Sequence, residues 1–250
     1  MKLFMISDLH LSFAFEKPMD IFGDRWKNHT ERIKTSWTAT VSDEDAVIIG
    51  GDVSWAISFN DVLPDLRWID ALPGKIKIIL RGNHDYWWAT LQKMKGLVAE
   101  NQLNSIFFLR NDALEVAGFD LCGTRGWVLP SDDTFKTEDQ RIFDREVIRM
   151  NLSLNELALL RQRRGTACPT IAVMHYPPIS EKGQTSALSS LLAPSDIKLC
   201  LFGHIHHEVP FYSASPIIEG VRYVLTSADH LEFQPLLIGE DGIFQEKMRF

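Results

Sequence analysis

Short apolar runs, rich in isoleucine, valine and leucine, recur along the chain. The clearest are residues 3–6, 46–49, 76–80, 170–174 and 198–202. Continuous apolar runs of this length indicate strands that are buried on both faces. The pattern therefore predicts a sheet in the interior of the protein, covered on both sides.

Helical patterns lie between several of these runs. Each resembles a capping box at its start, where a serine or threonine is followed three residues later by an acidic or amide residue. The pairs are Ser58 with Asp61, Thr137 with Gln140, and Ser153 with Glu156. Strands that alternate with helices predict an α/β fold with a largely parallel sheet.

The last part of the chain has a different pattern. Residues 221–226, 236–238 and 244–248 are short apolar runs separated by turns such as Asp241-Gly242. Turns of this kind join neighbouring strands in hairpins, so we expect antiparallel strands here. Because we find no internal repeat, linker or low-complexity segment, we expect one domain that spans residues 1–250.

Polar residues follow each of the five buried runs at the point where the strand is expected to end. They are Asp8 and His10, Asp52, Asn83 and His84, His175, and finally His204 and His206. Ligand sites of open α/β sheets lie outside the carboxyl ends of the strands. The sequence therefore predicts that five strand ends converge on one polar site.

The types of residue at this site indicate a metal centre. In an extended segment, residues two apart point the same way, so Asp8 with His10 and His204 with His206 form two ligand pairs. A set of Asp, Asn and His without thiolate suits Mn, Fe, Zn or Ni rather than a structural zinc site of the cysteine type. Asp52 follows two glycines that allow a sharp turn, and its two oxygens could bridge two ions.

These residues resemble the sequence blocks of the calcineurin-like metallophosphoesterase family, in particular its small bacterial-type phosphohydrolases. The family blocks DxH, GD, GNHD, a lone His and GHxH occur in this order as Asp8-Leu9-His10, Gly51-Asp52, Gly82-Asn83-His84-Asp85, His175 and Gly203-His204-Ile205-His206. One such block alone has little meaning, but five in order between residues 8 and 206 are a specific signal. The resemblance implies a four-layer αββα sandwich of two mixed β-sheets with helices on the outer faces.

The resemblance also implies a role for each site residue. Asp8, His10 and His206 would hold one divalent ion, Asn83, His175 and His204 would hold the other, and Asp52 would bridge the two. His84 would lie near the leaving group as a catalytic residue, and Asp85 would orient it. We therefore expect a metal-dependent phosphoesterase.

The charge of such a centre suits a phosphate substrate. With neutral imidazoles, only Asp8 and Asp52 carry negative charge, so two divalent ions leave a net charge of about +2. Two ions about 3.5–4 Å apart can clamp a phosphoryl group and lower the pKa of a bound water to about 7, which supplies hydroxide. A protonated His84 would then stabilise the developing charge or protonate the departing alkoxide.

The composition is that of an ordinary globular protein, with 45% hydrophobic and 24% charged residues. The net charge of −7 and the lack of a block of basic residues disfavour duplex nucleic acid as a partner. Three widely spaced cysteines, Cys122, Cys168 and Cys200, suggest free thiols in a reducing compartment. We expect no signal peptide, no membrane span and a cytoplasmic location.

Further residues outside the blocks are weaker candidates for the site. His29, His207 and His230 are more often structural than functional in such positions. Aromatic residues near the blocks could stack on a substrate ring, although packing onto the core is the more common role; they are Phe13, Phe15, Phe22, Trp26 and Trp127. Arg25, Arg81 and Arg125 could each clamp a phosphate, or lie in ordinary surface pairs.

Small phosphodiesters or nucleotides are the expected substrates, and phosphomonoesters are an alternative. A protein serine/threonine phosphatase of the same family is disfavoured, because such enzymes continue the second block with an Asp-Arg pair, whereas Asp52 is followed here by Val53-Ser54-Trp55-Ala56. Family pyrophosphatases of the lipid A pathway usually have Arg in place of His84. A catalytically silent binding scaffold would typically lack ligands or the leaving-group histidine, and none is missing. The sequence leaves the oligomeric state open.

Overall fold

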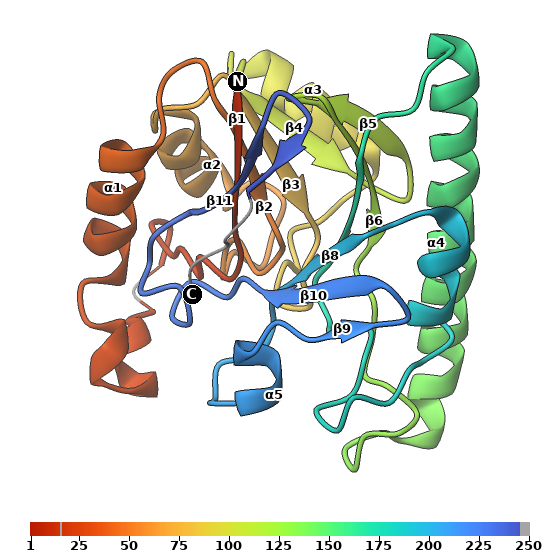
Figure 1. Cartoon of the computed structure of the whole chain (residues 1–250). Helices are drawn as coiled ribbons and strands as arrows, with labels where there is room; N and C mark the ends of the chain where they lie inside the picture. Colours follow the sequence, from red (N-terminus) through yellow and green to blue (C-terminus); the bar gives the residue numbers. More distant parts are fainter. Residues whose placement is uncertain (16, 246–250) are drawn as a thin grey trace.

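Two six-stranded β-sheets pack face to face, and helices cover their outer faces (Figure 1). This arrangement is seen in a computed structural model that describes residues 1–15 and 17–245. The expected four-layer αββα sandwich with two mixed sheets is confirmed.

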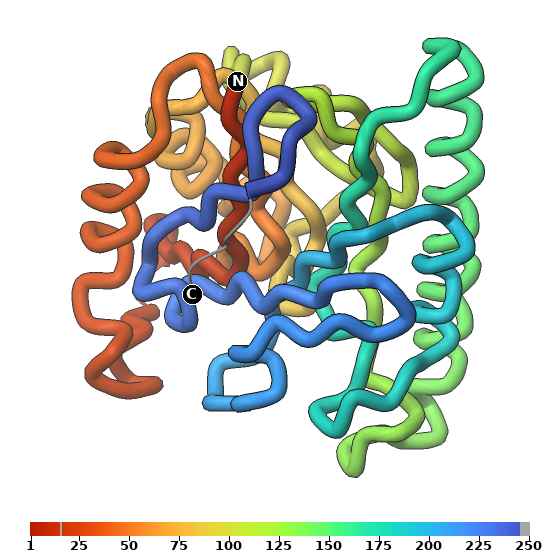
Figure 2. Tube along the Cα trace, in the orientation of Figure 1, coloured from red at the N-terminus to blue at the C-terminus, as the bar shows by residue number. Residues whose placement is uncertain are grey.

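The first sheet has the strand order β12-β11-β1-β2-β3-β4. Its strands are β1 (Lys2–Ile6), β2 (Ala46–Ile49), β3 (Ile76–Leu80), β4 (Ile106–Leu109), β11 (Leu236–Glu240) and β12 (Ile243–Phe244). Strands β1 to β4 are parallel, whereas β11 runs antiparallel to β1 and β12 runs antiparallel to β11. Figure 2 shows the red N-terminal strand beside the blue β11, so segments from both ends of the sequence share one sheet.

The second sheet has the order β5-β6-β7-β8-β10-β9. Its strands are β5 (Ala113–Val116), β6 (Phe119–Thr124), β7 (Thr170–Met174), β8 (Leu199–Phe202), β9 (Ile217–Ile218) and β10 (Val221–Leu225). The expectation that the last strands are antiparallel holds for β11 and β12 and for the pairing of β10 with β9, whereas on its other side β10 lies parallel to β8. The expected run 244–248 ends outside the described residues after 245.

Helices α1 (His29–Thr40), α2 (Leu63–Asp70) and α3 (Leu91–Glu100) pack against the first sheet, and the long α4 (Thr137–Arg164) packs against the second. Shorter helices lie in the connections: α5 (Pro210–Ser213), η1 (Met19–Phe22), η2 (Asp24–Trp26), η3 (Ser189–Leu191) and η4 (Ala193–Ser195). Arg161, Arg163 and Arg164 lie in the last turn of α4, where the helix dipole favours positive charge.

Two of the three predicted helix starts are displaced and one is wrong. Ser58 bonds to Asp61 in a turn before α2, and α4 is capped one residue early, at Lys136, with Asp139 accepting from the Lys136 N–H. Ser153 lies in the middle of α4 instead of at a start. Its buried hydroxyl accepts from the Gly123 N–H at 2.8 Å and donates to the Asp112 carbonyl at 2.6 Å, so it joins the helix to the second sheet.

Three apolar layers hold the sandwich together. Along β1, Phe4 and Ile6 pack toward the helices, whereas Leu3 and Met5 pack between the two sheets. This alternation is the period of two expected of a strand with both faces buried. The third layer lies between the second sheet and α4, where Phe143 and Met150 contact the sheet.

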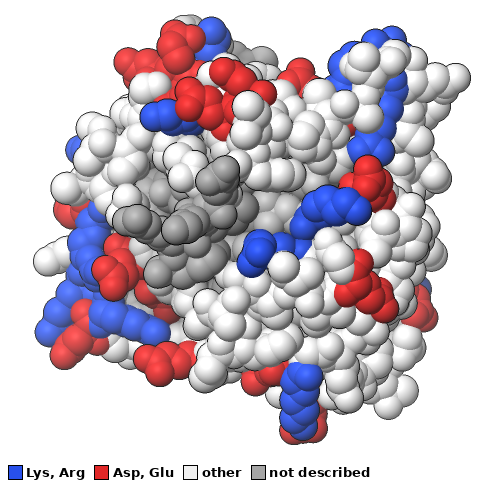
Figure 3. Space-filling model, in the orientation of Figure 1, with Lys and Arg blue, Asp and Glu red and all other residues white. Residues whose placement is uncertain are grey.

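The surface carries charges of both signs, and Lys and Arg are interspersed with Asp and Glu on the face drawn in Figure 3. All three cysteines are free, as expected. Within the described ranges, none of the helices has the length and apolar character needed to cross a membrane.

Candidate metal centre

The loops after β1 and β2 lie side by side and bring the first proposed ligands together. The Asp8 N–H donates to the Gly51 carbonyl at 2.9 Å, and the His10 N–H donates to the Asp52 carbonyl at 3.0 Å. These bonds continue the parallel pairing of β1 and β2 beyond the strands. Asp8, His10 and Asp52 consequently share one end of the first sheet.

Four of the proposed ligands have left-handed backbone conformations. Their φ angles are 61° at Asp8, 47° at His10, 48° at Asp52 and 73° at His204. The expectation of a simple extended alternation in the DxH and HxH pairs is therefore wrong. Residues other than glycine rarely adopt this backbone conformation. It persists where the surrounding structure imposes it, commonly at functional sites.

Glycines allow the loops to approach one another closely. A Cβ atom at Gly82 would lie 2.1 Å from the backbone nitrogen and Oδ1 of Asp52, and a Cβ atom at Gly203 would lie 2.4 Å from Asp8 Oδ2. Any larger residue would therefore push the strand ends apart. The glycines of the GNHD and GHxH blocks serve this close packing.

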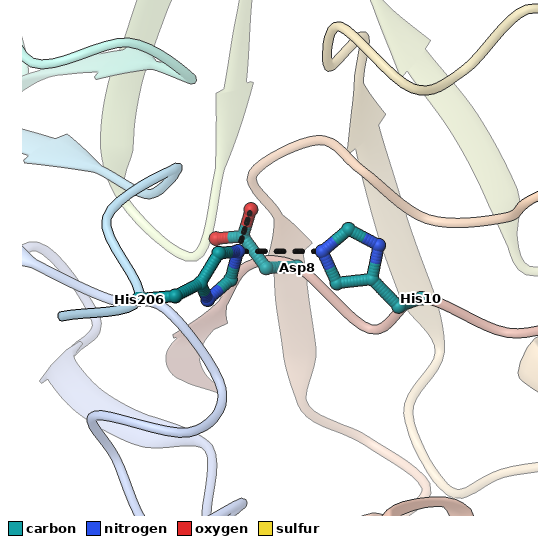
Figure 4. Close-up of side chains that lie close together, drawn as sticks. All are labelled: Asp8, His10 and His206. Carbon is teal, nitrogen blue, oxygen red and sulfur yellow. Dashed lines mark hydrogen bonds and ion pairs between the residues drawn. The ribbon is translucent and has the colours of Figure 1, made fainter. Parts of the chain in front are cut away.

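The first candidate ligand group consists of Asp8, His10 and His206, whose ligand atoms all lie within 4.8 Å of one another. His206 Nε2 lies 3.3 Å from His10 Nε2 and 3.7 Å from Asp8 Oδ1 (Figure 4). Two imidazole nitrogens bound at about 2.0–2.1 Å to one tetrahedral ion are separated by about 3.3 Å. The side chains are thus spaced as ligands of one ion.

The second group consists of Asp52, His175 and His204, again with ligand atoms within 4.8 Å. The amide oxygen of Asn83 lies 2.7 Å from His175 Nε2, which adds Asn83 to this group. Asp52 lies between the two groups. Its Oδ2 atom is 4.0 Å from His10 Nε2 and 3.5 Å from His175 Nε2.

The tautomer of His175 leaves its Nε2 atom free to bind a metal. A carbonyl can only accept a hydrogen bond, so the Nδ1 atom 3.1 Å from the Gly50 carbonyl carries the proton. Nε2 then presents a lone pair to the oxygen of Asn83. Two acceptors at this distance repel each other unless a proton or a cation lies between them, and burial lowers the pKa of His175 to about 3.

The protonation tendencies of the buried groups fit a cation as well. Burial raises the pKa of Asp8 to about 8, and burial also raises the pKa of Asp52. Burial lowers the pKa of His10 and of His204 well below the usual range, so these imidazoles are neutral with lone pairs available. Buried carboxylates of this kind require a compensating positive charge, which divalent ions supply.

A residue that the sequence analysis missed, Asp229, fixes the orientation of His206. Its Oδ1 atom lies 2.9 Å from His206 Nδ1, and its Oδ2 atom lies 3.1 Å from a guanidinium nitrogen of Arg25. Metal-binding histidines are commonly oriented by a carboxylate in this way, with the other nitrogen left for the metal. Asp229 lies 23 residues beyond His206, outside the five blocks, so no local pattern marks it.

His84 lies beside Asp52 and Trp55. Its backbone N–H donates to Asp52 Oδ1 at 2.7 Å, and the centroid of its ring lies 4.5 Å from that of the Trp55 ring. Its buried Nδ1 atom has no hydrogen-bond partner among residues 1–15 and 17–245. Burial lowers the pKa of this imidazole, and the Asp52 carboxylate opposes that effect.

Asp85 bonds to the loops on either side of the centre. Its carboxylate accepts hydrogen bonds from the N–H groups of Val53, Ser54 and Gly82 and from the indole of Trp87. It therefore ties the GNHD loop to the loop after β2 instead of bonding to the His84 ring. Asp85 positions His84 only through the backbone of this loop.

Two cavities adjoin the centre. One, of about 340 Å³, is lined by His10, Asp52, His84, His204 and His206 together with Met19, Phe22, Arg25, Trp26, Trp55 and His207. The other, of about 360 Å³, includes Trp127, Tyr176, His204, His207 and Tyr212 in its wall. The centre is thus open to small molecules from two sides.

Of the weaker histidine candidates, one lines the cavities and two do not. His207 lines both cavities and lies 3.0 Å from Glu181. His29 packs against the rings of Trp26 and Phe233 and does not line either cavity. His230 is half-buried and also lies outside both cavity walls.

Among the aromatic candidates, Trp26 and Phe22 line the first cavity and Trp127 lines the second. Phe13 and Phe15 are exposed and line neither cavity. Sequence analysis did not single out Trp55, which stacks on His10 with a centroid distance of 4.9 Å and an interplanar angle of 24°. Its position three residues after Asp52 was the available signal.

Two solved structures are similar to this chain. A protein of unknown function from Aquifex aeolicus is similar with 16% identity and a TM-score of 0.48, over 94% of this chain and 95% of that one. The crystal structure of TT1561 from Thermus thermophilus is similar with 11% identity and a TM-score of 0.55, over 95% of this chain and 97% of that one. The second likeness supports the fold. A comparison with curated proteins found no match.

The model of one protein family matches most of the chain. The model for calcineurin-like phosphoesterase matches residues 1–208, which include all seven proposed metal ligands. Together with the two adjoining ligand groups, this match indicates a dinuclear divalent metal centre of a phosphoesterase. The chain belongs to the calcineurin-like phosphoesterase family.

Proposed function

We propose that this protein hydrolyses small phosphodiesters or nucleotides at a centre of two divalent metal ions. The observation that carries the proposal is the position of Asp52 Oδ2, 4.0 Å from a histidine nitrogen of one ligand group and 3.5 Å from one of the other. A carboxylate oxygen in this place can join two ions into one site that faces a phosphate.

We assign the ligands as the family resemblance implies. Asp8, His10 and His206 would hold one ion, Asn83, His175 and His204 would hold the other, and Asp52 would contact both. Mn, Fe, Zn and Ni all suit this nitrogen and oxygen donor set, and Mn is our first choice. When bound, such ions polarise a phosphoryl oxygen and activate a water for attack on phosphorus.

The protein groups around the centre then complete the reaction. His84 lines the first cavity beside Asp52, where an ester oxygen leaving phosphorus can reach its ring. We assign it the transfer of a proton to that oxygen. Asp229 and the Gly50 carbonyl keep His206 and His175 in the tautomers that leave Nε2 for the metal.

The first cavity supports a small substrate that contains a ring. Its volume of about 340 Å³ is in the range of small-molecule sites, and Met19, Phe22, Trp26 and Trp55 give it an apolar wall. Aromatic walls stack on rings such as nucleobases. A phosphoprotein substrate is disfavoured because the chain after Asp52 lacks the Asp-Arg pair of the protein phosphatases.

The proposal is tested by a substrate screen with the purified protein. Phosphomonoesters, phosphodiesters, cyclic nucleotides and dinucleotides are offered with added Mn, Ni, Zn or Mg, and a chelator serves as the negative control. We expect turnover of a phosphodiester or nucleotide that the chelator abolishes. Efficient dephosphorylation of phosphoserine peptides without phosphodiester turnover would contradict the proposed substrate class, and no turnover with any metal would favour a binding scaffold.

A further inference from the structure

A third cavity, of about 340 Å³, carries an unusual concentration of arginine. Its wall includes four arginines and one carboxylate: Arg81, Arg110, Arg125, Arg149 and Glu146. The remaining wall contains Trp88, Leu80 and Leu109 beside the smaller residues Ala89, Thr90 and Asn111. We call this cavity the arginine pocket. Its formal charge of about +3 contrasts with the net charge of −7 of the whole chain.

The arginine pocket lies at the ends of strands that also lead to the metal centre. Arg81 directly follows β3 and precedes Gly82, the glycine that packs against Asp52. Arg125 directly follows β6, and its carbonyl accepts from the N–H of His175 at 3.0 Å. The pocket therefore borders the side of the centre that Asn83 and His175 form.

The one carboxylate in the pocket is already engaged. Glu146 is fully buried and accepts from Arg149 Nη1 at 2.5 Å, from Arg125 Nη2 at 3.5 Å and from the hydroxyl of Thr124. In the described part of the chain, Arg81 and Arg110 have no carboxylate within ion-pair distance, and the buried Nε atoms of Arg81 and Arg125 have no hydrogen-bond partner. The pocket thus has more positive donors than the protein satisfies.

We infer that the arginine pocket binds an oxyanion of the phosphate class. Guanidinium groups bind phosphate through paired N–H donors, and several of them around one cavity suit a multiply charged anion. This inference rests on the proposed function for its source of ligand: the anion is either a second phosphate of the substrate that reacts at the metal centre or free phosphate. Both sources present the same oxygen atoms to the four arginines.

Phosphate binding tests the pocket independently of catalysis. Binding of inorganic phosphate to the metal-loaded protein is measured by calorimetry for the wild type, Arg110→Gln, Arg149→Gln and, as a control, Arg163→Gln, which changes an exposed arginine on α4 outside the pocket. We expect two classes of site in the wild type. Each pocket variant weakens one class about tenfold or more, since it loses charge-assisted hydrogen bonds, and the control weakens neither.

Chelation of the metals separates the two classes. The chelated wild type should keep the pocket class and lose the other. The inference would be overturned if calorimetry showed a single class of phosphate site, with the same affinity in all four proteins, that disappears on chelation. This result would count against the pocket even if the protein hydrolyses esters. Conversely, pocket binding that persists in a protein without hydrolytic activity would leave the inference standing while the proposed function fails.

A pair of matched substrates identifies the source of the anion. Adenosine 5′-monophosphate has one phosphate, and adenosine 3′,5′-bisphosphate has two. If the pocket holds a second substrate phosphate, Arg110→Gln should raise KM for the bisphosphate about tenfold and leave KM for the monophosphate unchanged. If the pocket takes free phosphate, both KM values stay unchanged while calorimetry still shows the weakened class.

Discussion

Asp229 Oδ1 lies 2.9 Å from Nδ1 of His206. This buried carboxylate fixes the orientation of the imidazole ring, so that its Nε2 atom points toward Asp8 and His10. Asp229 belongs to no sequence block of the family resemblance. It contributes to the centre through His206, and its other carboxylate oxygen forms an ion pair with Arg25.

Replacement of Asp229 should weaken one metal position more than the other. We expect Asp229→Ala to lower the affinity of the Asp8–His10–His206 group for metal by about 10–100-fold, because His206 loses the acceptor that orients it. The second group should keep its affinity. Metal titration of the purified variant measures both. Asp24→Ala, which removes an exposed carboxylate paired with Lys27, is the control. Equal weakening of both positions would show that Asp229 acts on the fold as a whole.

Phe22 tests whether the apolar wall of the first cavity binds a ring. Phe22 stacks on Trp55 with a centroid distance of 6.5 Å and does not belong to either ligand group. Stacking on a base is worth about 1–3 kcal/mol, so Phe22→Ala should raise KM for a nucleotide ester by about 5–150-fold. KM for a methyl phosphodiester should not change. The control is Phe107→Ala, which replaces an exposed phenylalanine on β4. An equal rise in KM for the nucleotide ester in this variant would show that the wall of the first cavity does not bind the ring.

His84 can be separated from the metal ligands by leaving-group chemistry. A nitrophenolate leaves phosphorus readily, whereas an alkoxide requires a proton. His84→Asn should therefore reduce kcat/KM for alkyl esters by about 10²–10⁴-fold and for nitrophenyl esters clearly less. His206→Ala should reduce both alike, since it removes a ligand. Metal content is measured beside the kinetics. An equal loss on both esters in a fully metallated His84→Asn protein would assign His84 to phosphate positioning instead.

Asp120 should make stability depend on acid pH. It is buried on β6 and binds Arg164 at 2.8 Å and Arg161 at 3.2 Å, both in the last turn of α4. Burial raises the pKa of Asp120, but the hydrogen bonds from Arg164, Cys168 and Arg161 together outweigh it and hold the pKa below 3.8. A carboxyl group with a depressed folded pKa contributes stability above its unfolded pKa, and this contribution is lost as the pH falls through the folded value.

Asp120→Asn should therefore lower the free energy of unfolding by about 3 kcal/mol at pH 7, because it leaves two arginines without their carboxylate. The difference from the wild type should begin to shrink below about pH 4, the unfolded-state pKa of an aspartate, and should be lost once the pH falls through the depressed folded-state pKa of Asp120. Urea unfolding at several pH values measures this. Glu156→Gln, which breaks an exposed pair with Arg163, should cost less than about 1 kcal/mol. A difference that does not depend on pH would assign the role of Asp120 to shape rather than charge.

Much of the fold is readable from the sequence because the central strands are buried on both faces. The apolar run 46–49 and the mainly apolar run 76–80, which contains Lys77, coincide with β2 and β3 at both ends. Strands β4, β5, β6 and β9 were not predicted; β5, for example, is half exposed and contains Glu115, and β6 contains Asp120. The antiparallel pairing of β10 with β9 agrees with the turn pattern, whereas its parallel pairing with β8 across a long connection was not predicted, because no local pattern marks it.

The site shows the same division between local and distant information. Asp8, Asp52 and His204 stand in sequence blocks, so their types and order identify them. Their left-handed backbone conformations follow from the packing of neighbouring loops, which no period along one strand encodes. Asp229 and the arginine pocket depend on contacts between segments far apart in the chain, and sequence patterns do not mark such contacts.

The position of Asp52 between the two ligand groups defines the proposed dinuclear centre, and metal content tests it most directly. Elemental analysis of purified wild type, Asp52→Ala and Asn83→Ala gives the number of ions per chain, and circular dichroism checks that each variant is folded. Asp52→Gly, which accepts the left-handed backbone without strain, should behave as Asp52→Ala does. We expect two ions per chain in the wild type, loss of both ions in Asp52→Ala, and loss of chiefly one in Asn83→Ala. Retention of two ions in both Asp52→Ala and Asn83→Ala would contradict the assignment of Asp52 as the bridge.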